Sequence, residues 1–236
     1  MGSLKNVNIP GLNENLSEFI GAYLGDGTIT KYFIKFTGDA RYDKPYFEYL
    51  ENLVVDLFGI KASMYSDKRF GKNQLYLTIC SRTLCEFLNK KYGLIYGDKL
   101  VNNTLIPNKI LKNKKLSIAC LRGLIDTDGS VSRRGRHGSQ FCVQFSSHNN
   151  NLLNQVHKFG KTIGVFTYLT GIETGTNNWK NILKYFRIVG SSNPRHVTRF
   201  YLKYKFNNVI YVKEFPKYYK KYKKHIVLPF KLGLMV

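Results

Sequence analysis

Apolar and polar positions follow two different periods along the first half of the chain. Residues 16–26 leave almost no polar face, which predicts a helix that is buried on all sides. Residues 31–37 alternate with a period of two and predict a strand, with Tyr32 among the residues of its apolar face. Residues 43–59 then show helical spacing between an acidic cap and a closing glycine, and residues 74–79 alternate again.

The same order of patterns returns in the second half. Residues 118–131 predict an apolar helix, and residues 140–146 alternate as a strand. Asn149 or Asn150 caps a helix that Gly164 closes, and residues 183–189 resemble a second strand. Each half therefore predicts a helix, a hairpin, a helix, a hairpin and a more variable helical end.

Two segments carry this internal repeat most clearly, LSEFIGAYLGDGTI at residues 16–29 and IACLRGLIDTDGSV at residues 118–131. Aligning their Asp-Gly pairs gives an offset of 102 residues. Two copies of one unit in a chain imply a pseudo-twofold arrangement, with the join in the polar, basic stretch 106–117. Two independent domains are the alternative, which the apolar character of both motif helices disfavours.

Small residues recur at matching positions of the two motif helices. Gly21 and Gly25 lie four residues apart, and each costs about 1 kcal/mol relative to alanine in a helix interior. Gly123 and Thr127 have the same spacing in the second copy. Small residues at this spacing let two helix backbones approach closely. The sequence therefore predicts a seam at which the two motif helices pack together.

Such packing would bring Asp26 and Asp128 together at the C-terminal ends of two helices. The helix dipole disfavours a carboxylate there, and two carboxylates repel each other. A divalent cation relieves both penalties, and Mg²⁺ prefers carboxylate and carbonyl oxygens. The alternative is that each Asp-Gly pair is a turn after a helix. Its recurrence at matching positions in a basic chain favours a metal site.

The charge of the chain points to a polyanionic partner. The 236 residues include 37 Lys plus Arg and 15 Asp plus Glu, a net charge of +22. A charge of this size attracts nucleic acid at long range, although a membrane-surface protein or a ribosomal-type RNA binder would share it. No apolar run approaches the roughly 18 residues of a membrane span, so we expect no membrane partner. The hydrophobic share of 43% argues against disorder.

FIGAYLGDG at residues 19–27 and LRGLIDTDG at residues 121–129 resemble the two signature motifs of the LAGLIDADG homing endonucleases. Leu24 stands where the family name has its first Asp. The resemblance covers nearly the whole chain. It implies an α+β fold of two pseudo-twofold-related αββαββα repeats, residues 12–112 and 113–236, each with an antiparallel sheet that forms half of a DNA-binding saddle.

The resemblance also implies an activity, namely cleavage of a long asymmetric target in double-stranded DNA by a monomer. One phosphodiester per strand would be hydrolysed, leaving a staggered break. Asp26 and Asp128 would bind the catalytic metal together with the backbone carbonyls of Gly25 and Thr127, in two sites or in three sites that share the acids. Mg²⁺ is the expected metal, Mn²⁺ would substitute, and Ca²⁺ would bind without efficient cleavage. Asp126, which has no acidic counterpart in the first motif, would be structural.

The family also places a basic residue near each centre, and Lys99 resembles that residue in the first half. Lys213 is the expectation for the second half, at the start of a lysine-rich tail that predicts phosphate contacts or an amphipathic helix. Polar residues on the outer face of the strands and in the second hairpin loop suit base edges in a major groove. The expected DNA-binding residues are Lys31, Lys35, Thr37, Gln74, Tyr76, Thr78, Arg133, Arg134, Arg136, Gln140, Gln144, Ser146, Tyr185 and Arg187.

Two other functions remain open on the same fold. One is an RNA maturase that binds and helps to splice the intron encoding it, and the other is a cleavage-dead DNA-binding protein. The retention of both acids favours cleavage and leaves a dual role open. We expect an intracellular protein, and the sequence does not distinguish an organelle (mitochondrion or chloroplast) from a prokaryotic cytoplasm.

Overall fold

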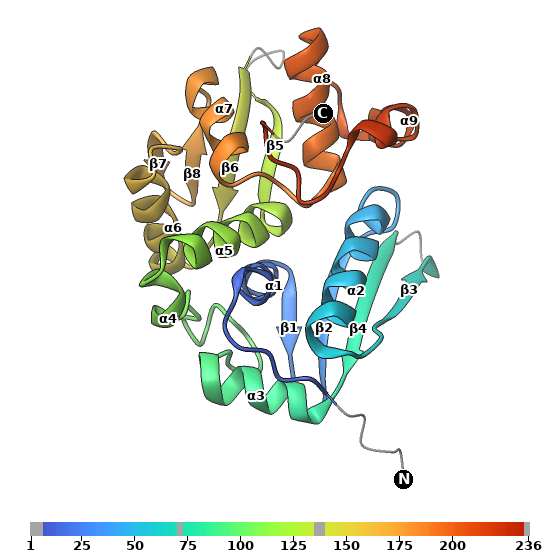
Figure 1. Cartoon of the computed structure of the whole chain (residues 1–236), viewed down its shortest axis with the longest axis vertical. Helices are drawn as coiled ribbons and strands as arrows, with labels where there is room; N and C mark the ends of the chain where they lie inside the picture. The colour runs from blue at the N-terminus through green and yellow to red at the C-terminus, as the bar shows by residue number, and fades with distance from the viewer. Residues whose placement is uncertain (1–6, 70–72, 135–139, 234–236) are drawn as a thin grey trace.

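A computed structural model describes residues 7–69, 73–134 and 140–233, which form two αββαββα units followed by further helices (Figure 1). The first unit comprises α1 (Glu14–Leu24), β1 (Gly27–Ile29), β2 (Phe33–Asp39), α2 (Lys44–Phe58), β3 (Ser63–Asp67), β4 (Gln74–Cys80) and α3 (Arg82–Tyr92). The second comprises α5 (Lys114–Thr127), β5 (Gly129–Arg134), β6 (Gln140–Ser146), α6 (Asn150–Thr162), β7 (Tyr168–Thr170), β8 (Glu173–Thr176) and α7 (Trp179–Ile188). The remaining helices are α4 (Asn108–Leu111), which joins the units, and α8 (Pro194–Phe206), η3 (Val212–Glu214), α9 (Phe215–Tyr222) and η4 (Lys223–His225), which follow them.

Each unit forms its own four-stranded antiparallel sheet. The strand orders are β1-β2-β4-β3 and β5-β6-β8-β7, so the two sheets share one topology. The α+β fold of two repeats is therefore confirmed. Among the described residues, no helix is both long enough and apolar enough to cross a membrane.

Local signals in the sequence explain where the helices begin and end. Pro45 lies in the first turn of α2, after Asp43, and the helix ends at Gly59, whose φ of 66° suits glycine. Asn149 caps α6 because its side chain accepts hydrogen bonds from the backbone at the start of the helix. Gly164 follows the end of α6 with a φ of 69°. These predicted boundaries are confirmed.

The predicted strand at residues 183–189 is wrong, because this segment belongs to α7. Its buried residues Ile182, Tyr185 and Phe186 recur at helical spacing, and Asn178 caps the helix. Tyr185 is therefore enclosed in the core and Arg187 lies on the exposed side of a helix, so neither is on the sheet face where we expected it.

The strand that completes the second sheet is β8, which contains two threonines and a glycine and lacks apolar alternation. A smaller correction concerns Tyr32, which is 64% exposed in the turn before β2 together with Lys31. The inward face of β2 carries Ile34 and Phe36, which lie opposite Ile79 and Leu77 of β4.

Helices α1 and α5 form the seam between the units and share the most extensive contact between any two helices (Figure 1). A methyl group on Gly21 would overlap the backbone carbonyl of Cys120, and one on Gly123 would overlap the carbonyl of Glu18. Inside the same seam, the Arg122 guanidinium and the Glu18 carboxylate form a buried ion pair at 2.6 Å. The two backbones therefore touch where the glycines lie.

We expect Gly21→Ala and Gly123→Ala each to lower the free energy of unfolding by about 3 kcal/mol, because the added methyl group must push two helix backbones apart. Urea titration followed by circular dichroism measures this loss. Gly11→Ala is the matched control, since a methyl group there meets open space. Equal stability of all three variants would show that the seam tolerates separation.

Candidate active site

The two motif acids lie where the motif helices end and the first strand of each unit begins. Gly25 is the residue at which α1 ends, and Asp26 follows it. Asp128 itself ends α5, with its backbone N–H donating to the carbonyl of Leu124. A methyl group on Gly25 would overlap the side chain of Thr127, so the two helix ends are in contact. Asp26 and Asp128 share a side-chain hydrogen bond across this junction.

The surroundings of the two acids favour their protonated forms. Both residues reach the surface, while protein atoms crowd their carboxyl groups. Burial raises the pKa of Asp26 to about 7, the charges of Asp128 and Asp43 add to this effect, and Lys99 opposes it. Burial also raises the pKa of Asp128, again opposed by Lys99. Ionisation of both carboxyl groups is therefore unfavourable in this place, and a bound cation would make it more favourable.

Lys99 reaches the same place from the segment that follows α3. Its ammonium donates to the backbone carbonyls of Tyr23 at 3.0 Å and Leu24 at 2.9 Å, and also to that of Gly25. These carbonyls are free because the helix ends there. Lys99 and Asp128 both line a cleft of about 470 Å³. A cation thus already occupies the negative end of α1.

The residues at this junction fit a divalent cation. Two carboxylates lie beside backbone carbonyls, which is the oxygen donor set that Mg²⁺ prefers, and the Lys99 ammonium shows that the carbonyls accept a positive charge. No cluster of three or more His, Cys, Asp or Glu side chains suited to a metal occurs in the described residues. A metal here would therefore depend on backbone, water or phosphate oxygens as well as on Asp26 and Asp128.

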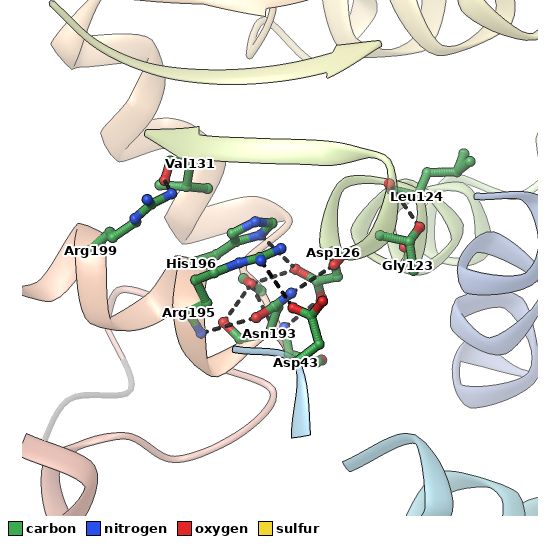
Figure 2. A network of polar contacts seen from close by, with 12 residues as sticks. Asp43, Gly123, Leu124, Asp126, Val131, Asn193, Arg195, His196 and Arg199 are labelled. Carbon is green, nitrogen blue, oxygen red and sulfur yellow. Dashed lines mark hydrogen bonds and ion pairs between the residues drawn. The ribbon is translucent and has the colours of Figure 1, made fainter. Parts of the chain in front are cut away.

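Asp126 points away from the acid pair and into the protein. Its carboxylate accepts hydrogen bonds from the Ser191 hydroxyl and from the Ser192 backbone N–H, the latter at 2.7 Å. Asn193 donates from its side chain to the Asp126 carbonyl at 2.8 Å (Figure 2). Burial raises the pKa of Asp126 to about 7, and the hydrogen bonds from Ser191 and Ser192 oppose that rise. Asp126 therefore anchors the segment between α7 and α8.

The outer face of the first sheet gathers most of the first unit's polar residues that were expected to contact DNA. Lys35 lies opposite Thr78, and Thr37 lies opposite Tyr76. The Lys35 ammonium is 5.3 Å from the centroid of the Tyr76 ring, which stacks on Tyr65 with centroids 4.9 Å apart. Gln74 accepts a hydrogen bond from the Tyr76 hydroxyl. This face is therefore polar, basic and aromatic.

The outer face of the second sheet holds a connected polar cluster. The Arg134 guanidinium donates to the Gln144 side chain at 2.9 Å and pairs with the Glu173 carboxylate at 2.5 Å. Gln140 and Ser146 lie on the same strand as Gln144 and share its face by strand alternation. Glu173 was missed in the sequence because β8 carries no strand pattern.

Three further expected residues lie elsewhere. Arg133 belongs to β5 instead of a loop, and its guanidinium is 4.3 Å from the centroid of the Tyr211 ring. Arg136 lies outside the described residues. Lys213 is exposed in η3, and no interaction joins it to either motif acid within the described parts of the chain.

Comparisons with known proteins identify a domain and a fold that this chain resembles. The model of a family described as a LAGLIDADG-like domain matches residues 115–200. A search of curated proteins found no match. The homing endonuclease I-WcaI bound to its DNA recognition sequence has a TM-score of 0.50 and 11% identity, covering 76% of this chain and 82% of that chain. That likeness shows a common fold.

Two other solved structures are similar to a comparable extent. I-DmoI in complex with DNA and Mn has a TM-score of 0.49 and 16% identity, over 75% of this chain and 96% of that chain. The N-terminal LAGLIDADG domain of DUF199/WhiA has a TM-score of 0.48 and 16% identity, over 75% of this chain and 82% of that chain.

The matched domain begins in α5, contains the motif LRGLIDTDG and extends into α8. The first unit has the same sheet topology as this domain. Its motif, FIGAYLGDG, lies at the end of α1 and brings Asp26 close to Asp128. Residues 115–200 of the chain thus match a LAGLIDADG-like domain, and the chain shares the fold of the homing endonuclease I-WcaI.

Proposed function

We propose that this protein is a site-specific double-strand DNA endonuclease that recognises a long asymmetric target. The observation that carries the proposal is the meeting of Asp26 and Asp128 at the adjoining ends of α1 and α5. One acid from each unit, related by a pseudo-twofold, suits two antiparallel strands of a duplex. Hydrolysis of one phosphodiester per strand would then leave a staggered break, and a single chain would act as a monomer.

Asp26, Asp128 and the carbonyls of Gly25 and Thr127 would hold Mg²⁺, with Mn²⁺ as a substitute and Ca²⁺ as a ligand that supports little cleavage. When bound, a divalent cation neutralises charge and lowers the pKa of a coordinated water. The chain itself contributes the fixed positions of the two carboxylates and the Lys99 ammonium beside Asp128. A half-buried cation at this place would stabilise the negative charge that develops on a phosphate during hydrolysis.

The outer faces of the two sheets would bind the duplex. Lys35 and Arg134 supply positive charge, while Gln74 and Gln144 offer amide groups that pair with adenine in a major groove. Thr37, Tyr76, Thr78, Gln140 and Ser146 complete the two faces. Lys31, in the turn before β2, would contact phosphate. The net charge of +22 supports a polyanionic partner such as duplex DNA.

We also propose that the repeats meet between residues 112 and 113, directly before the residue that caps α5. The cap is Asn113, whose side chain accepts hydrogen bonds from the first backbone N–H groups of the helix. The halves would not fold independently, because separation would expose both motif helices and the Glu18–Arg122 ion pair.

Selection from a randomised duplex library tests the function. In Mg²⁺ we expect breaks at one sequence, and in Ca²⁺ we expect retention of the same sequence without breaks. Asp26→Asn and Asp128→Asn should bind that sequence within a few-fold of the wild-type affinity and cut at least about a hundredfold more slowly. Asp56→Asn, on the exposed side of α2, is the matched control.

The outcome of this selection also separates the alternatives. Enrichment of one duplex sequence without cleavage in Mg²⁺ would favour a cleavage-dead DNA-binding protein. Absence of any duplex preference, together with tight binding of intron RNA, would favour a maturase. Unchanged cutting by either Asn variant would contradict the assignment of the two acids.

Lys99→Met should slow cleavage about a hundredfold, because it removes a half-buried charge beside Asp128 while keeping the length of the side chain. Gel-shift titration in Ca²⁺ should show little change in affinity for the selected target. Lys112→Met, at an exposed position after α4, should cut at the wild-type rate. A Lys99→Met protein that cuts normally would leave Lys99 only the role of capping α1.

A further inference from the structure

One arginine contacts every other strand of the second sheet, whose four strands lie side by side (Figure 1). Arg134 belongs to β5, and its guanidinium donates to the Gln144 side chain of β6 at 2.9 Å and reaches the Tyr168 hydroxyl of β7 at 3.5 Å. On β8, the Glu173 carboxylate pairs with the same guanidinium at 2.5 Å and accepts from the Gln144 side chain at 3.4 Å. Arg134, Gln144 and Glu173 therefore form a closed polar triad.

Strand register shows what the first sheet has at the matching places. Lys35 lies opposite Thr28, and Gln144 lies opposite the residue 102 positions after Thr28, which is the offset of the two motifs. Tyr76 and Glu173 each lie opposite the residue two positions further along the same strand. Lys35 thus matches Gln144, and Tyr76 matches Glu173. In the first sheet the Lys35 ammonium lies 5.3 Å from the Tyr76 ring centroid, so a ring occupies the place of the carboxylate.

Glu173 puts a negative charge on a face that we propose binds DNA. Its side chain is 21% exposed and that of Arg134 is 46% exposed, so both remain within reach of a ligand. A carboxylate there repels phosphate, and it cancels the charge that Arg134 would offer to the DNA backbone. The ion pair therefore lowers affinity for DNA of any sequence. A repulsive group of this kind is typical of interfaces that discriminate between partners.

The contacts of Arg134 also determine which part of its guanidinium is left for a base. Within the described residues, Nη1 makes the contacts to Gln144 and Tyr168, and Nη2 makes the contact to Glu173. The Nε–H and one N–H of Nη2 remain, and these two nitrogens are bonded to the same carbon. In the major groove guanine offers the acceptors O6 and N7, which bind two such donors of an arginine together. The triad therefore suits guanine.

We propose that Glu173 determines sequence specificity by holding the Arg134 guanidinium over one base pair of the target, where it favours guanine. This inference rests on the proposed function. Glu173 is a positioning residue that acts through Arg134, because its carboxylate keeps the guanidinium on the sheet and away from phosphate. The matching base pair in the other half of the target meets Lys35 and Tyr76 instead. The two halves are therefore recognised by different chemistry, as an asymmetric target requires.

Selection of randomised duplexes by binding in Ca²⁺ measures base preference without cleavage. Wild-type protein should select guanine at the position that Arg134 contacts. Glu173→Gln should lower that preference about tenfold and leave the other positions unchanged, because glutamine keeps the size of the side chain and loses the charge that fixes Arg134. Arg134→Met should lose the same preference, and adding Glu173→Gln to it should change nothing further. Glu48→Gln, in an exposed pair with Lys44 on α2, is the matched control.

Salt dependence separates this role from a structural one. In Glu173→Gln the released Arg134 guanidinium can bind a phosphate, so affinity for a duplex that lacks the guanine should rise. The slope of log affinity against log salt should steepen by about 0.9, since one more phosphate is neutralised. Glu48→Gln should leave the slope unchanged. Loosening of the sheet alone would weaken binding and would not steepen the slope.

Several outcomes would overturn the proposal. These are an unchanged guanine preference or salt slope in Glu173→Gln, a loss of preference spread over many positions, and an effect of Glu173→Gln that persists without Arg134. A wild-type protein that selects one sequence in Ca²⁺ and does not cut it in Mg²⁺ would refute the endonuclease function, while the selection still tests Glu173. A wild-type protein that selects no duplex sequence would refute both.

Discussion

Close contact between the backbones of α1 and α5 is the constraint on which the rest of the structure depends. Gly21 and Gly123 permit it, each lying against a backbone carbonyl of the other helix. The distance between the helices sets the distance between Asp26 and Asp128, because Asp26 follows the residue that ends α1 and Asp128 is the residue that ends α5. The Glu18–Arg122 ion pair crosses the same seam in a buried position, where losing one partner would leave an uncompensated charge. Packing and chemistry therefore share one interface.

The site gathers more negative charge than the fold alone favours. The motif acids lie at two helix C-termini, and burial together with the charges of Asp128 and Asp43 raises the pKa of Asp26 to about 7. Lys99 offsets part of this negative charge at the end of α1, and Arg195 pairs with the Asp43 carboxylate. The remaining imbalance is the physical reason why a divalent cation and a phosphate are favourable partners here. Sites poised in this way commonly give up stability for function.

Much of the fold follows from local signals in the sequence, and its exceptions have specific causes. The Asp-Gly repeat, the glycine spacing and the caps of α2 and α6 depend on neighbouring residues, so the sequence alone predicts them. The region from β7 to α7 cannot be predicted in this way. Glu173–Thr176 pairs as a strand although its sequence lacks apolar alternation, and Tyr185 lies in a helix whose sequence is also compatible with a strand. In the candidate site, the repeated motif predicts Asp26 and Asp128, and the resemblance to the family predicts Lys99. The pairing of Arg195 with Asp43 joins residues from different units, which no local pattern reports.

The difference between the units follows from what comes after each. The segment after α3 must continue through α4 to the second motif helix, and Lys99 lies on that connection. The segment after α7 leads only to α8, which packs beside β5 and carries Arg199 to the carbonyl of Val131 at 3.2 Å (Figure 2). Ser191 and Ser192 lie in this segment, and the Asp126 carboxylate accepts a hydrogen bond from each of them. Fusing two repeats in one chain thus removes the requirement for identical ends, and the segments after α3 and α7 contact the two motif helices through different side chains, those of Lys99 and Asn193.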